Sequence, residues 1–112
     1  PSWAQNSTEA EDEVLSLGHS LGTVSFAPAV PVAICSLERG GFAVLTERPA
    51  QLWIIDSSGE TDGAPVALPG VFSRPRGILP MSRGHFTVVD RSGVLGEIDR
   101  KGRLVRTLPG PV

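Results

Sequence analysis

Residues 75–90 read PRGILPMSRGHFTVVD and residues 31–46 read PVAICSLERGGFAVLT, so similar residues recur 44 positions apart. The likeness resumes at IDSSGE (55–60) against IDRKGR (98–103) and at LPG (68–70) against LPG (108–110). A repeat of about 40 residues, built from short apolar runs and turns, is typical of a β-propeller blade. The repeat therefore predicts the fold and indicates where a binding surface would lie.

Apolar and β-branched runs of three to seven residues alternate with Gly, Pro, Ser and Asp from Val14 onward, which favours strands over helices. We expect an all-β chain, a partial propeller whose blades are four antiparallel strands. The predicted strands are 14–17, 22–26, 31–37, 42–46, 51–56, 65–68, 76–80, 85–90, 94–99 and 103–108.

The repeat also divides the chain. Residues 1–13 are polar and acidic and are expected to be a tail or linker. Residues 14–30 fit the remnant of a preceding blade, and 31–70 and 71–112 are each expected to be one blade. The apolar runs that begin at Phe42 and Phe86 are nearly continuous, as in strands that are covered on both faces.

Charge is uneven along the chain although the net charge is only -2. Residues 1–30 contain four acidic and no basic residues, whereas residues 71–112 contain three acidic and eight basic ones. Nine of the ten basic residues are Arg, the side chain suited to bidentate contact with phosphate or carboxylate.

Cysteine use and targeting signals bear on the compartment. Cys35 is the single cysteine and lies in an apolar run, so it is expected to be a small buried hydrophobe, and no disulfide can form within the chain. The sequence shows no signal peptide and no apolar run long enough for a membrane span. We expect a cytoplasmic protein without a membrane partner.

Asn6 begins a glycosylation sequon that matters only in a secreted protein. The chain starts with Pro, and we expect it to be a piece of a larger protein.

The second copy resembles an NHL repeat. That family has the pattern Pro-x-Gly-apolar, then Gly-x-apolar-x-Val-x-Asp, then apolar-x-apolar-Asp-x-x-Gly, and the second copy resembles it at residues 75–78, 84–90 and 96–102. The first copy resembles the pattern less closely, because Val32-Ala33 replaces x-Gly and Thr46 stands where the second copy has Asp90. The likeness covers about residues 31–110.

The resemblance implies a six-bladed propeller that serves as a platform for protein or RNA and not as a catalyst, as in tripartite-motif ubiquitin ligases. It implies substrate recruitment as one role. This chain has the length of two to two and a half blades, so open sheet faces and edges would remain. We therefore expect that it needs the remaining blades or associates with itself.

One motif suggests an enzyme instead. Gly18-His19-Ser20-Leu21-Gly22 matches the nucleophile elbow of serine hydrolases, with Ser20 as the nucleophile, and Asp56 and His85 follow in the right order. The elbow needs a helix after the serine, and residues 23–31 hold β-branched residues and two prolines. We rank this hydrolase, and a propeller lyase with a metal in its channel, below a binding role.

The remaining polar residues indicate structure. Two His and one Cys are too few and too scattered for a zinc site, and no cofactor is indicated. His85 is expected to be a surface residue beside a turn. Asp56, Asp90 and Asp99 end strands, where a carboxylate caps the amides of a turn.

The predicted binding residues are Arg74, Arg76, Arg91 and Arg48, which a propeller would place at one end of its blades. They could contact an acidic protein or the phosphates of single-stranded RNA. A solvated surface, paired with Glu47, Glu97 and Asp99, is the alternative. The nearest aromatic is Phe72, which weakens the RNA hypothesis because single-stranded RNA is bound by stacking. The opposite end would carry Arg83, His85, Arg100, Lys101 and Arg103.

Overall fold

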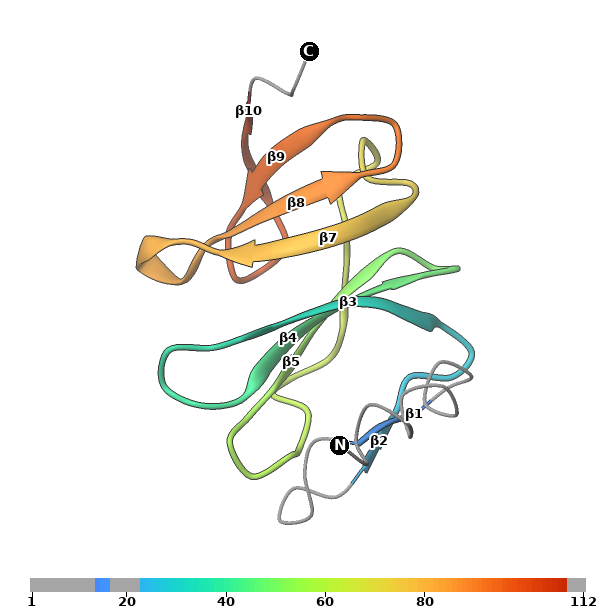
Figure 1. Cartoon of the computed structure of the whole chain (residues 1–112), viewed down its shortest axis with the longest axis vertical. Coiled ribbons are helices and arrows are strands. Elements are labelled where there is room, and N and C mark those ends of the chain that lie inside the picture. Colours follow the sequence, from blue (N-terminus) through green and yellow to red (C-terminus); the bar gives the residue numbers. More distant parts are fainter. Residues whose placement is uncertain (1–13, 17–22, 109–112) are drawn as a thin grey trace, which may run out of the picture.

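Short strands joined by tight turns make up the part of the chain that the computed structural model describes, residues 14–16 and 23–108 (Figure 1). Side chains are described from Val24 onward. All predicted strands are present, with ends within one residue of the prediction, and the all-β prediction is confirmed. They are β1 (Val14–Ser16), β2 (Thr23–Ser25), β3 (Val30–Ser36), β4 (Phe42–Glu47), β5 (Gln51–Ile55), β6 (Val66–Ala67), β7 (Pro75–Pro80), β8 (Phe86–Asp90), β9 (Leu95–Ile98) and β10 (Leu104–Leu108), with one 3-10 turn, η1 (Ser82–Gly84).

The longer strands form two four-stranded antiparallel sheets, β3-β4-β5-β6 and β7-β8-β9-β10, each in chain order. Strand pairing shows that the repeat is structural. Pro31 pairs with Thr46 and Pro75 pairs with Asp90, and both sheets shift register immediately afterwards. Each copy of the repeat thus forms one four-stranded antiparallel sheet. β1 and β2 form a separate antiparallel pair.

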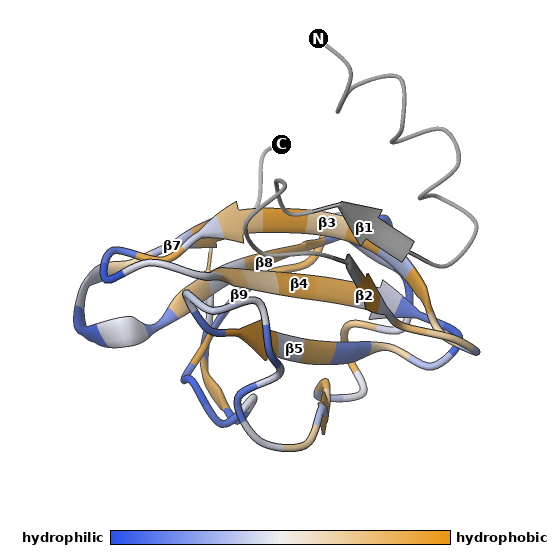
Figure 2. Cartoon of the chain, turned by 90° about the horizontal axis from the view of Figure 1, so that it is seen from below, coloured by the Kyte–Doolittle hydropathy of each residue, from blue (hydrophilic) through white to orange (hydrophobic). Residues whose placement is uncertain are grey.

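The two sheets lie against each other, with β3 beside β7, and share one hydrophobic core (Figure 1). The first sheet contributes Ala43, Leu45 and Leu52, all at most 1% exposed. The second sheet and the segment before it contribute Phe72, Ile78, Phe86, Val88 and Ile98. Figure 2 shows hydrophobic residues along the strands and hydrophilic ones in the turns. Burial of these side chains holds the sheets together, and truncating a phenylalanine such as Phe86 to Ala would cost about 3–5 kcal/mol.

A second, smaller core covers the other face of the first sheet. Val24 and Phe26 pack on Val44 and Ile55, and the ring of Phe26 meets that of Trp53 edge to face at 4.8 Å. β4 is therefore buried on both faces, as its continuous apolar sequence predicts.

β8 differs from β4, and the prediction that both strands are covered on two faces is wrong for β8. Phe86 and Val88 are buried against the first sheet, but Thr87 and Val89 on the opposite face are only half-buried, and Leu79 beside them is 60% exposed. Within the described residues no further sheet covers this side. We call it the open face.

Carboxylates cap the turns, which confirms the role predicted for three aspartates. Asp56 accepts hydrogen bonds from the N–H groups of Ser58 and Glu60. Asp99 accepts them from Lys101 and Arg103 in the same way. Each turn ends in a glycine with positive φ, 89° at Gly59 and 80° at Gly102, as the turn residues predict. In the residues described, no helix has the length and apolar character needed to cross a membrane.

Candidate interaction surfaces

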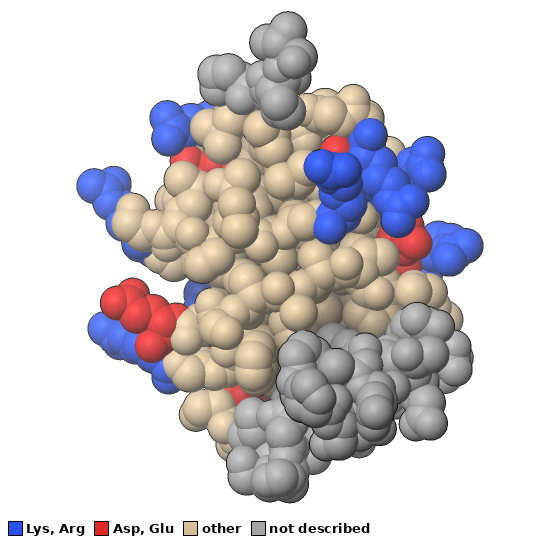
Figure 3. Space-filling view, in the orientation of Figure 1, with Lys and Arg blue, Asp and Glu red and all other residues tan. Residues whose placement is uncertain are grey.

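The four predicted arginines lie at one end of the two sheets. Arg74 precedes β7 and Arg91 follows β8, and the N–H of Arg91 donates to the carbonyl oxygen of Arg74 at 2.9 Å. Arg76 is exposed in β7, and Arg48 is in the β4–β5 turn of the first sheet. Figure 3 has the orientation of Figure 1, and it shows a cluster of basic side chains on the side where the β4–β5 and β8–β9 turns lie. We call Arg48, Arg74, Arg76 and Arg91 the arginine edge.

Asp90 fixes the backbone of the arginine edge. Its carboxylate is 1% exposed and accepts hydrogen bonds from the N–H of Arg74 at 2.8 Å and of Ser92 at 3.0 Å. Burial alone would raise the pKa of Asp90, but the hydrogen bonds from Ser92 and Arg74 outweigh burial and hold that pKa below its ordinary value. A charged carboxylate therefore joins the segment before β7 to the turn after β8, with an arginine on each side.

Thr46 has the equivalent place in the first sheet. It is fully buried, and its hydroxyl donates to the carbonyl oxygen of Pro49 at 2.9 Å. This closes the turn that carries Arg48, whose backbone has the left-handed φ of 52°. At this repeat position the first sheet thus has a neutral hydroxyl and the second sheet has a charged carboxylate, and both turns contain an arginine.

Arg74, Arg76 and Arg91 form no ion pair among the described residues, although the buried carboxylate of Asp90 attracts the charge of Arg74. Arg48 pairs with Glu47 at 3.8 Å, a long contact to a guanidinium whose side chain is 78% exposed. Glu97 and Asp99, the other acidic residues expected as partners of Arg74, Arg76 and Arg91, pair instead with Arg106 and Arg103. Three exposed guanidinium groups are therefore left to interact with solvent or a partner.

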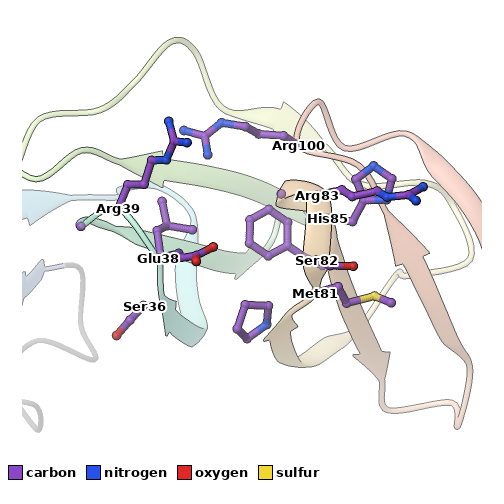
Figure 4. A pocket seen from close by; sticks show the side chains of 13 residues that line it. Ser36, Glu38, Arg39, Met81, Ser82, Arg83, His85 and Arg100 are labelled. Atoms are coloured by element: carbon purple, nitrogen blue, oxygen red, sulfur yellow. The ribbon is translucent and has the colours of Figure 1, made fainter.

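A cavity of about 840 Å³ opens at the opposite end, between the β3–β4 and β7–β8 turns (Figure 4). Its basic residues are Arg39, Arg83, His85 and Arg100, and Glu38 is its one acidic residue. Pro80 and Met81 add apolar surface. We call it the inter-sheet groove. The sequence predicts that Arg83, His85 and Arg100 lie together at this end, but it does not predict the groove, because the shape of the groove depends on how the two sheets stack.

His85 is not the simple surface residue that the sequence suggested. Its Nδ1 lies 2.6 Å from Oε2 of Glu97, and Nε of Arg106 donates to Oε1 of the same carboxylate at 2.9 Å. The hydrogen bond with His85 is the largest cause of the lowered pKa of Glu97, and Arg106 adds to it. His85 lies directly before β8, whereas Glu97 is in β9 and Arg106 is in β10, so these contacts tie the start of β8 to the two following strands.

The described residues do not support the geometry that the alternative serine hydrolase would need. Ser20 and its glycines, like the Asn6 sequon, lie outside the described residues. Asp56 caps its own turn, His85 is engaged by Glu97, and the residues after the motif, Thr23–Ser25, form strand β2 where the elbow would need a helix. The described residues contain no group of three His, Cys, Asp or Glu that could hold a metal ion.

Comparison with known proteins gives a likeness of fold. No family model matches the chain, and no curated protein matches it. A protein of unknown function from Bacteroides caccae has a similar solved structure, with a TM-score of 0.62 and 16% sequence identity over 81% of this chain. The matched part is 35% of that protein, so this chain spans about a third of its length.

Proposed function

We propose that this chain is a non-catalytic interaction platform, an NHL-like propeller portion that binds a protein partner through the arginine edge. The observation that carries the proposal is the gathering of exposed arginines from both sheets at one end, three of them without an ion pair among the described residues. Arg side chains form paired hydrogen bonds with carboxylates, so an acidic protein surface is the complementary partner.

A protein partner is favoured over single-stranded RNA because the arginine edge offers no stacking platform. RNA-binding modules combine cationic side chains with exposed aromatic rings. Phe72 is the aromatic residue nearest the arginine edge in sequence, and it is fully buried in the shared core. RNA binding through phosphate contacts alone is the runner-up.

The finer parts of the proposal rest on the sequence resemblance. Residues 75–78, 84–90 and 96–102 resemble the NHL pattern, and two four-stranded antiparallel sheets are what that pattern implies. On this basis we propose substrate recruitment for a ubiquitin ligase as the role of the parent protein and the cytoplasm as its compartment. The open face supports the further proposal that the chain needs the remaining blades or associates with itself.

Retention of proteins on the immobilised chain tests the proposal. We expect the double variant Arg74→Glu/Arg76→Glu to lose proteins that the wild type retains from a cell extract. The matched control Lys101→Glu/Arg103→Glu carries the same charge change in the β9–β10 turn at the opposite end, outside the lining of the inter-sheet groove, and should keep those proteins. Ribonuclease treatment of the extract should change nothing.

Two results would overturn this proposal. Loss of the retained molecules after ribonuclease treatment would assign the arginine edge to RNA. Equal loss in both double variants would mean that retention follows net charge and not this surface.

A further inference from the structure

The internal repeat places an arginine at the same position of the first hairpin turn in each sheet. Arg39 and Arg83 lie 44 residues apart, and each precedes a glycine of positive φ. Both turns are closed in the same way, by hydrogen bonds from Leu37 to Gly41 at 3.0 Å and from Met81 to His85 at 2.8 Å. Stacking the sheets therefore sets the two equivalent arginines on opposite sides of the inter-sheet groove (Figure 4).

The backbone at Arg83 is unusual for the residue that it carries. Its φ of 65° and ψ of 20° lie in the left-handed region, which a glycine would adopt without strain. The turn keeps an exposed arginine there, although this position disfavours any side chain. Arg83 also lines the inter-sheet groove, so its side chain is available to a ligand there.

Arg100 adds a third guanidinium from the β9–β10 turn. In Figure 4 it and Arg39 point toward one another, although they come from different sheets. Asp62 pairs with Arg100 at 3.2 Å, but both side chains of this pair are at least half exposed, so water screens the interaction. Two like charges that converge over a cavity are stabilised when an anion lies between them.

The groove also has the size and lining of a peptide site. A volume of about 840 Å³ is far more than one carboxylate requires and falls in the range of ligand pockets. Pro80 and Met81 offer apolar contacts, and Glu38 can accept hydrogen bonds from backbone N–H groups of a ligand.

We propose that the inter-sheet groove binds an extended acidic peptide whose two carboxylates lie three residues apart. One would pair with Arg83 and the other with Arg39 and Arg100. Stacked sheets are about 10 Å apart, so the equivalent turns have about that spacing. Three residues of a polyproline-II segment span about 9 Å and return to the same side of the peptide. This site lies at the opposite end from the arginine edge and does not rest on the proposed function.

Two peptides of equal charge and different carboxylate spacing, together with an analogue that lacks the carboxylates, test this proposal. The probes are labelled Gly-Glu-Pro-Pro-Glu-Gly, its isomer Gly-Pro-Glu-Glu-Pro-Gly and its Gln analogue, titrated by fluorescence anisotropy with up to about 1 mM of the full chain. We expect the first peptide to bind at least about fivefold more tightly than the other two. Arg39→Glu should weaken its binding by about the same factor.

Two further variants separate binding from folding. Arg83→Gly suits the left-handed backbone and is expected to fold, yet it should weaken binding at least about fivefold. Lys101→Glu, next to Arg100 and outside the groove lining, should leave binding within about twofold. Equal affinity for the two isomers, absence of saturable binding, or an equal loss in Lys101→Glu would overturn the proposal.

Discussion

Gly96 shows how one residue lets the second sheet close on the shared core. It is buried in β9, and a Cβ atom added to it would lie 2.5 Å from the ring of Phe72. Phe72 is itself fully buried, so the ring has little room to move. We expect Gly96→Ala to lower the free energy of unfolding by about 1–3 kcal/mol, the usual effect of overpacking a core, in chemical denaturation.

Gly70 provides the matched control for this substitution. A Cβ atom there would meet no atom within 4 Å, and its φ is outside the left-handed range. Gly70→Ala should therefore be neutral or stabilise the chain by up to about 1 kcal/mol, since it restricts the unfolded chain. A Gly96→Ala variant as stable as Gly70→Ala would contradict the close packing of Phe72 on β9.

The turns that end the strands make stability depend on pH. A hydrogen bond from Ser58 lowers the pKa of Asp56, and one from the N–H of Arg103 lowers the pKa of Asp99. The pKa of Asp90 is lowered too, in spite of its burial. A carboxyl group whose pKa is lower in the folded state stabilises the fold above its unfolded pKa of about 4, and this contribution is lost as the pH falls through the folded value.

We therefore expect the melting temperature to hold between about pH 5 and 7 and to fall below about pH 4. Asp90→Asn should be less stable at pH 7, by about 1–3 kcal/mol, because the buried N–H groups lose a charged acceptor. Its melting temperature should also change less with pH than that of the wild type. Parallel profiles for the two proteins would show that Asp90 does not contribute to the acid sensitivity.

The sequence predicts the elements well because their signals are local. Apolar runs and Gly-ended turns fix each strand to within one residue, and the repeat explains why Arg74 and Arg91 meet at one end. The side-chain contacts of His85 and Arg106 with Glu97 join three segments that are distant in sequence, and no local pattern encodes them. The groove likewise forms between two sheets. One signal was available, since Arg39 and Arg83 occupy the same repeat position.

In the described residues, the outer face of the first sheet is covered by the smaller core, whereas the outer face of the second sheet is the open face. In the first sheet Ala43 and Leu45 are buried against the second sheet, whereas their repeat equivalents Thr87 and Val89 lie on the open face. These positions are buried in the first sheet because the second sheet packs on them. We therefore expect copies of the chain to associate through the open face of the second sheet. Sedimentation velocity should show species that grow with concentration.

Charge on the open face should prevent this association. Leu79→Lys is expected to shift the sedimentation profile toward the monomer, whereas Val71→Lys, at an exposed apolar residue of the segment between the sheets, should leave it unchanged. A wild-type chain that stays monomeric and melts cooperatively at all concentrations would show that the open face needs no cover.

Site-specific photo-crosslinking tests most directly whether the arginine edge meets a protein. Ser73 is exposed next to Arg74, so a photoreactive amino acid at this position would report what lies against the edge. We predict adducts that protease removes and ribonuclease does not, and that disappear when Arg74→Glu and Arg76→Glu are added to the same chain. Adducts sensitive to ribonuclease, or adducts that persist after both substitutions, would contradict the account.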